Sequence, residues 1–121
     1  MSKPLFLFEI LVPCQWNNGR GVRTRHHKEW DKKIHGLTGG LTIMPVAKGQ
    51  WVDGGVLYSD RVIPVRIMCT QSQIEDIAEM TIEHYRQLAV MYFKISDAAH
   101  IVECTLDQRS KFHAVDNAPG R

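Results

Sequence analysis

The sequence predicts a single α+β domain in which an antiparallel sheet of four strands carries two helices on one face. Three observations predict this class. The chain has 121 residues, a length typical of one domain. Apolar, strand-like runs alternate with two segments whose apolar residues recur every three or four positions. An Asp-Gly-Gly turn at residues 53–55 separates two strand-like runs, which indicates a hairpin.

The first strand and the first helix are expected in the N-terminal third of the chain. Residues 5–12 form an apolar run that only Glu9 interrupts, which is typical of a buried strand. The helix is expected over residues 23–36, because Trp30 and Ile34 recur at helical spacing among polar residues. This part of the sequence therefore begins with a β-α unit.

The central part of the chain predicts a hairpin. Its first strand starts at residues 41–45 and continues, after a break, through residues 50–52, and the return strand covers residues 56–69. Pro64 conflicts with a central position for the return strand, because proline has no N–H to donate to a neighbouring strand. We expect a bulge or a strand end at that point.

The remaining elements complete a β-α-β-β-α-β order. A second helix is expected over residues 71–87 and a last core strand over residues 88–95, with a short edge strand at residues 98–104. Residues 105–121 are polar and without periodicity, so we expect a domain of residues 1–104 and a flexible C-terminal tail. This order is typical of ferredoxin-like domains.

One face of the predicted sheet has no helix to cover it. Leu5, Leu7 and Leu11 share that face with Glu9, because alternate residues of a strand point to the same side. An uncovered face with so much apolar surface favours self-association in a small symmetric ring.

Charge and motif content exclude several classes of function. A net charge of +2 is too small to indicate a nucleic-acid partner. Residues 20–33 hold six basic side chains against two acids, which fits a solvated helix face, a phosphate or carboxylate site or, least well, a nucleic-acid contact. The apolar runs are too short to span a bilayer, so we expect no membrane partner and a cytoplasmic location.

The reactive side chains form no known motif. Three cysteines lack Cys-x-x-Cys spacing, and the six histidines lack zinc-site spacing, so reduced thiols and no metal site are expected. No nucleophile elbow or phosphate-binding loop is present, and no cofactor is expected.

Two groups of residues are candidate binding residues. Glu9 and Arg66 lie in strands expected to be neighbours, where they form either an ion pair or part of a ligand site. Trp51, Tyr58 and Asp60 flank the hairpin turn. Aromatic rings beside a carboxylate attract an organic cation, although an exposed hairpin of this kind also suits packing against a neighbouring subunit.

Several short motifs carry a resemblance to known proteins. The chain resembles the GlnB-like (PII-like) trimeric α/β sandwiches, and among them the phage S-adenosylmethionine lyases and a related group of uncharacterised small proteins. The motifs that carry the resemblance are Arg25-His26, Gly40-Leu41-Thr42, Gly49-Gln50-Trp51, Asp60-Arg61, Val65-Arg66 with Cys69, and Tyr85-Arg86-Gln87. The lyases have a tyrosine where this chain has Trp51, and an acidic pair where this chain has Asp60 followed by Arg61.

The resemblance implies an enzyme that cleaves S-adenosylmethionine to methylthioadenosine and homoserine lactone, which phages use against restriction-modification in the host cytoplasm. It implies a homotrimer whose catalytic residues are Asp60 and Tyr58. Substrate binding would fall to Trp51, Glu9, Arg66 and Gln87. The substrate's own carboxylate would attack its γ-carbon, so the protein needs only to position the substrate and stabilise charge.

Two other functions stay open from the sequence. A non-enzymatic GlnB-like trimer would bind a nucleotide or another anionic metabolite between its subunits, which suits the basic residues 20–33. A small phage protein that inhibits a host enzyme through its surface is a further alternative.

Overall fold

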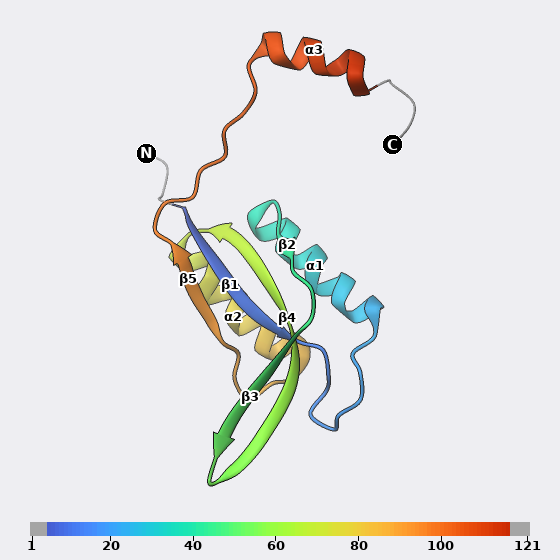
Figure 1. The fold of residues 1–121 in the computed structure, drawn as a ribbon, viewed down its shortest axis with the longest axis vertical. Helices are drawn as coiled ribbons and strands as arrows, with labels where there is room; N and C mark the ends of the chain where they lie inside the picture. Colours follow the sequence, from blue (N-terminus) through green and yellow to red (C-terminus); the bar gives the residue numbers. More distant parts are fainter. Residues whose placement is uncertain (1–4, 117–121) are drawn as a thin grey trace.

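The computed structural model describes residues 5–116, which form a sheet with two helices on one side and a third helix apart from it (Figure 1). Along the chain the elements are β1 (Phe6–Pro13), α1 (Thr24–Thr38), β2 (Thr42–Ile43), β3 (Ala47–Asp53), β4 (Val56–Cys69), α2 (Gln71–Tyr85), β5 (Tyr92–Ser96) and α3 (Leu106–Asp116).

The sheet confirms the predicted α+β, ferredoxin-like class. Its antiparallel strands run in the order β2-β4-β1-β5, and β3 pairs with the first half of β4. Helix α2 packs against β1 and α1 packs against β4, while the opposite face of the sheet has neither helix (Figure 1). The strand expected over residues 41–45, with its continuation after a break at residues 50–52, forms two separate strands, β2 and β3.

The division between β2 and β3 explains how Pro64 fits into a central strand. Pro64 pairs with Leu11 of β1, and its carbonyl accepts a hydrogen bond of 2.9 Å from the backbone N–H of Met44. In an extended strand the amide nitrogen and the carbonyl oxygen of one residue point toward the same neighbouring strand. The nitrogen of Pro64 therefore faces the break between β2 and β3, where the register shifts by one residue, and no hydrogen bond of the ladder with β1 is lost.

The hydrophobic core lies between the sheet and helices α1 and α2. Alternate residues of β1 enter it, as the sequence predicts, and Glu9 lies on the opposite, open face. The core consists of Phe8, Ile10, Val12, Trp30, Ile34, Val65, Ile67, Cys69, Ile74, Ile77 and Tyr85. A polar contact joins the two helices inside it, because the indole N–H of Trp30 donates to the hydroxyl of Thr81 at 3.0 Å.

The helix ends differ from the sequence prediction by a few residues for local reasons. Helix α1 continues past Gly36 to Thr38, because Gly39, with φ 89°, provides the left-handed residue that ends it. Helix α2 ends at Tyr85, where Arg86 adopts the same conformation with φ 53°. Strand β5 therefore begins only at Tyr92, after a loop, rather than at residue 88.

The segment after β5 also differs from the prediction. Residues 98–104 form no strand, so the expected edge strand is wrong, and residues 106–116 form α3 instead of an irregular segment. Thr105 and Gln108 exchange hydrogen bonds of 2.8 and 3.2 Å in a capping box, which starts the helix. This Thr-x-x-Gln pattern is the sequence signal for α3. The domain limit at residue 104 and the flexibility of the tail stay predictions.

No helix within residues 5–116 combines the length and the apolar composition that crossing a bilayer requires.

Candidate functional site

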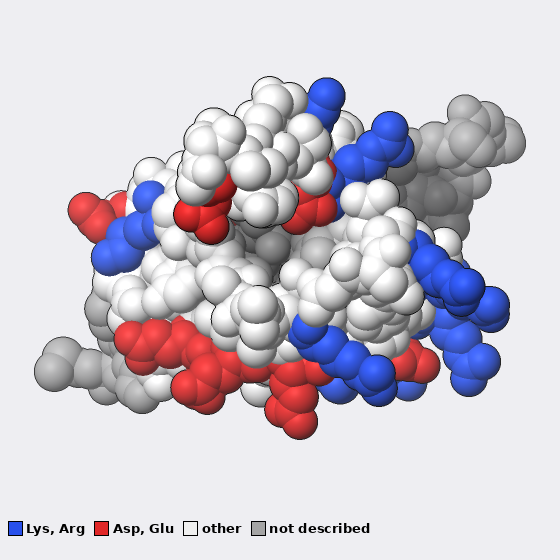
Figure 2. Space-filling model, turned by 90° about the horizontal axis from the view of Figure 1, so that it is seen from below, with Lys and Arg blue, Asp and Glu red and all other residues white. Residues whose placement is uncertain are grey.

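A cavity of about 310 Å³ lies between the β3–β4 hairpin and the loop that follows α2. We call it the hairpin cavity. It is lined by Leu11, Pro13, Gly49, Gln50, Trp51, Asp60, Val62, Gln87, Ala89, Val90 and Met91. It brings together three of the six predicted site residues, Trp51, Asp60 and Gln87, from two distant parts of the sequence. Figure 2, which views the molecule from the side of the hairpin tip, shows this surface hollowed near its middle.

The aromatic part of the hairpin cavity is a stacked pair. Trp51 of β3 is directly opposite Tyr58 of β4, and their ring centroids lie 5.7 Å apart with planes inclined by 14°. Both side chains are more than two-fifths exposed. Trp51 lines the cavity and Tyr58 does not, so Tyr58 stacks behind the ring that a ligand would contact.

The polar part of the hairpin cavity comes from Gln50, whose amide donates to the hydroxyl of Ser59 at 3.3 Å, and from two side chains that are hydrogen-bonded to the backbone. The carboxylate of Asp60 accepts a hydrogen bond of 2.8 Å from the backbone N–H of Arg61. The side-chain amide of Gln87 donates to the carbonyl of Tyr85 at 3.0 Å, just beyond the end of α2. A carboxylate and two amides thus face a cavity whose other walls are mostly apolar.

The other two predicted residues form the ion pair expected of neighbouring strands. Glu9 and Arg66 are partners in the β1–β4 register, and the Nε of Arg66 donates to a carboxylate oxygen of Glu9 at 3.1 Å. Neither residue lines the hairpin cavity. Arg66 lines a different cavity of about 360 Å³ beside Gly39, Gly40 and Leu41.

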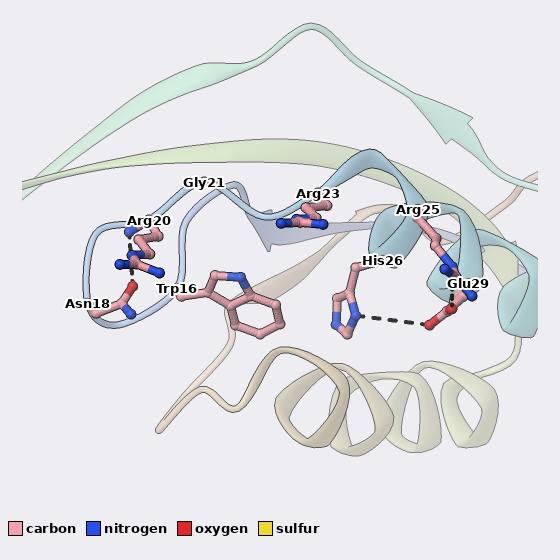
Figure 3. Close-up of a pocket in the computed structure, with 8 residues that line it drawn as sticks. All are labelled: Trp16, Asn18, Arg20, Gly21, Arg23, Arg25, His26 and Glu29. Carbon is pink, nitrogen blue, oxygen red and sulfur yellow. Dashed lines mark hydrogen bonds and ion pairs between the residues drawn. The ribbon is translucent and has the colours of Figure 1, made fainter.

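A larger and more basic cavity lies at the start of α1. It measures about 580 Å³ and is lined by Trp16, Asn18, Arg20, Gly21, Arg23, Arg25, His26 and Glu29. Figure 3 shows the rings of Trp16 and His26 side by side, with Arg23 above them in this view. We call it the basic cavity. The first turn of α1 has no acidic residue and no side-chain cap, so its positive end is not neutralised.

Beside the basic cavity, a layer of rings joins α1 to α2. The hydroxyl of buried Tyr85 lies 2.7 Å from the Nδ1 of His27. Burial is the main cause that raises the pKa of Tyr85, with further increases from Asp31 and Cys14, and burial lowers the pKa of His27. Both groups are therefore held neutral, which suits a structural contact between the helices.

The sequence did not reveal one further cluster, formed by His26, Glu29 and His84. One ligand atom from each of the three side chains lies within 4.8 Å of the other two. The i, i+3 spacing of His26 and Glu29 on one helix was a partial signal. His84 lies 58 positions after His26, and only the packing of α1 on α2 brings it to the same place.

The sequence matches no family model and no curated protein. The fold, however, matches solved structures. A phage S-adenosylmethionine lyase in complex with S-methyl-5′-thioadenosine is similar at a TM-score of 0.61 and 11% identity, over 81% of this chain and 85% of that one.

Divalent cation tolerance proteins have the same fold. CutA1 from Oryza sativa is similar at a TM-score of 0.60 and 14% identity, over 88% of both chains. CutA1 from Ehrlichia chaffeensis is similar at a TM-score of 0.59 and 8% identity, over 84% of this chain and 88% of that one. These likenesses show a GlnB-like fold.

Proposed function

We propose that the protein binds S-adenosylmethionine in the hairpin cavity and cleaves it to methylthioadenosine and homoserine lactone. The observation that carries the proposal is the meeting of Trp51, Asp60 and Gln87 in one largely apolar cavity. A sulfonium ion is attracted to the face of an indole ring, and an ammonium group pairs with a carboxylate. The likeness to a lyase bound to S-methyl-5′-thioadenosine supports the same ligand class.

The reaction needs no nucleophile from the protein. A carboxylate oxygen of the substrate forms a bond to its own γ-carbon, and the bond from that carbon to the sulfonium sulfur breaks. The electron pair stays on sulfur, so methylthioadenosine leaves as a neutral thioether, and homoserine lactone keeps its ammonium group. Two opposite charges disappear in this step, so a weakly polar cavity that excludes water favours the transition state.

Each residue has a distinct role in this proposal. Trp51 contacts the sulfonium, and Asp60 binds the ammonium group and so orients the carboxylate toward the γ-carbon. Gln87 hydrogen-bonds the polar part of the substrate. Tyr58 is a positioning residue, because it stacks on Trp51 rather than lining the cavity.

We further propose that the active form is a homotrimer whose subunits meet around the hairpin. The hairpin and the loop before β5 expose large apolar side chains, namely Trp51, Val52, Val56, Leu57 and Met91. A patch of this kind is typical of a protein interface. A neighbouring subunit over the hairpin would cover the open side of the cavity and exclude water from it.

Cleavage of S-adenosylmethionine would deplete the methyl donor of the host. This loss would then protect a phage against restriction-modification.

Incubation of the purified protein with S-adenosylmethionine, followed by chromatography, tests the activity. We expect methylthioadenosine and homoserine lactone in equal amounts above the spontaneous background. Asp60→Asn should lower the rate by at least about tenfold, because it removes the charge that orients the substrate. Asp53→Asn is the matched control, since Asp53 lies exposed at the hairpin turn and outside the cavity. Absence of both products, or an unchanged rate in Asp60→Asn, would contradict the proposal.

A second candidate function rests on the basic cavity. Three arginines and the uncapped start of α1 favour a nucleotide or another anionic metabolite that is bound without turnover. Calorimetry with adenosine triphosphate tests it. Arg23→Gln should weaken binding, while Arg109→Gln on α3 makes the same change of charge elsewhere. Equal affinity in the two variants would exclude the basic cavity.

A further inference from the structure

Three potential metal ligands meet where α1 crosses α2. His26 lies in the first turn of α1, Glu29 lies one turn further on the same face, and His84 lies in the last turn of α2. Their ligand atoms all lie within 4.8 Å of one another. His26 and Glu29 also line the basic cavity, so two of the three ligands lie in the wall of that cavity (Figure 3).

The two histidines hold each other in a fixed orientation. The Nε2 of His26 lies 2.7 Å from the carbonyl oxygen of His84, and the Nε2 of His84 lies 2.8 Å from the carbonyl oxygen of His26. The rings stack at 3.9 Å, with planes inclined by 26°. A carbonyl only accepts, so each Nε2 carries the proton, and each Nδ1 of the neutral ring carries a lone pair.

This arrangement has the form of a built metal site. Histidines that bind metals generally donate the other ring N–H to a backbone carbonyl or a carboxylate, which sets the tautomer and the ring direction. Here both histidines already do so. The Nδ1 of His26 lies 4.0 Å from a carboxylate oxygen of Glu29, so the two atoms can share one ion with a small movement of the exposed glutamate.

We propose that His26, Glu29 and His84 bind one divalent transition-metal ion through two Nδ1 atoms and a carboxylate oxygen. Two imidazoles and one carboxylate suit zinc, which takes three protein ligands and leaves a fourth position open. Because His26 and Glu29 line the basic cavity, the open position faces it. A water molecule or an anion in the cavity would complete the coordination.

A lysine occupies the position that the ion would take beside His84. The Nζ of Lys33 lies 3.2 Å from the Nδ1 of His84, so its ammonium donates to the lone pair that the metal needs. Arg25 contacts Glu29 at 3.8 Å and is 91% exposed. Both long side chains are exposed and can move away. The ammonium group of Lys33 nevertheless competes with the metal ion for the Nδ1 of His84 and repels the ion by its charge. Removal of this lysine should therefore strengthen metal binding.

Calorimetry of the purified protein with zinc chloride is the first measurement. We expect one zinc ion per chain. Glu29→Gln should weaken binding by at least about tenfold, because an amide oxygen carries no charge. Glu79→Gln, on the exposed face of α2, is the matched control and should bind as the unmodified protein does. Absence of binding at millimolar zinc, or equal affinity in the two variants, would overturn the proposal.

Removal of the competing lysine is the second test, and it predicts a gain. Lys33→Gln should bind zinc several times more tightly than the unmodified protein. Lys32→Gln makes the same change of charge one position away and should have a smaller effect. Circular dichroism checks that every variant is folded. Equal affinities in the two lysine variants would show that the ion lies elsewhere, and would also overturn the assignment.

The test is independent of the proposed lyase activity. The hairpin cavity shares no lining residue with the cluster. Zinc binding can therefore fail while cleavage of S-adenosylmethionine succeeds, and the reverse outcome is equally distinguishable.

Discussion

The two halves of strand β4 make a sharp contrast. In its second half Val65 is 2% exposed, whereas in its first half Leu57 is 60% exposed, although both halves are rich in apolar residues. The second half pairs with β1 and packs under the helices. The first half pairs with β3, meets β1 only where Val62 pairs with Pro13, and extends beyond the helices (Figure 1).

The contrast shows that one strand serves two purposes. The second half belongs to a core that this chain completes by itself, with the close packing of an ordinary protein interior. The first half presents apolar side chains that no helix covers, together with the hairpin cavity. We therefore expect substitutions in the second half to change stability, and substitutions in the first half to change association and ligand binding.

The largest expected difference lies in cysteine reactivity. Cys69 ends the buried half of β4, and burial raises its pKa to about 11, while Cys104 is exposed after β5. At pH 8 a thiol reagent should modify Cys104 at least about a thousandfold faster, because Cys69 reacts only when the domain opens. Mass spectrometry after timed quenching measures both rates. Comparable rates would mean that the reagent reaches Cys69 in the folded domain, and that the second half of β4 is therefore not part of a closed core.

Truncation of one apolar side chain in each half should give the next largest difference. Ile67→Ala should lower the free energy of unfolding by about 2–5 kcal/mol, because it leaves a cavity in the core. Leu57→Ala should change it by less than about 0.5 kcal/mol.

Urea denaturation monitored by circular dichroism measures both variants, and sedimentation measures their association. Leu57→Ala should weaken self-association, whereas Ile67→Ala should not do so while it is folded. If Leu57→Ala strongly lowered the free energy of unfolding and left self-association unchanged, the proposed difference between the two halves of β4 would be wrong.

The smallest expected difference between two matched variants concerns the polar contact inside the core. Thr81→Val keeps the shape of the side chain but leaves the indole N–H of Trp30 without its acceptor. The free energy of unfolding should fall by about 1–3 kcal/mol, the usual cost of an unpaired buried donor. Thr24→Val makes the same substitution at the exposed start of α1 and is the matched control. Similar losses in the two variants would show that the buried bond contributes nothing specific.

Most of the fold was predictable from the sequence because its signals are local. The alternation in β1, the helical spacing of Trp30 and Ile34, and the Asp-Gly-Gly turn each depend on residues close together in the chain. The errors also have local causes. Gly36 and Gly39 can each end α1, and the sequence pattern predicts the first of them, whereas the residue with the left-handed conformation is Gly39. The capping box at Thr105 is a short signal in a segment without apolar periodicity.

The candidate site was predictable only in part. Trp51, Tyr58 and Asp60 flank one turn, so their proximity follows from the hairpin itself. Gln87 reaches the same cavity because α2 ends at a left-handed Arg86, which turns the chain toward the hairpin. Glu9 and Arg66 are partners, as their neighbouring strands predict, yet the structure places them outside the hairpin cavity.

Short-range periodicity and turn chemistry specify the order and type of the core elements, the inward face of β1 and the composition of the hairpin, so these can be read from the chain. Which distant residues meet is set by packing between elements. The cluster of His26, Glu29 and His84 depends on how α1 crosses α2, and the break opposite Pro64 depends on which edge of β4 its nitrogen faces. A linear pattern of residues carries no record of either arrangement, because both depend on elements that touch only after the chain has folded.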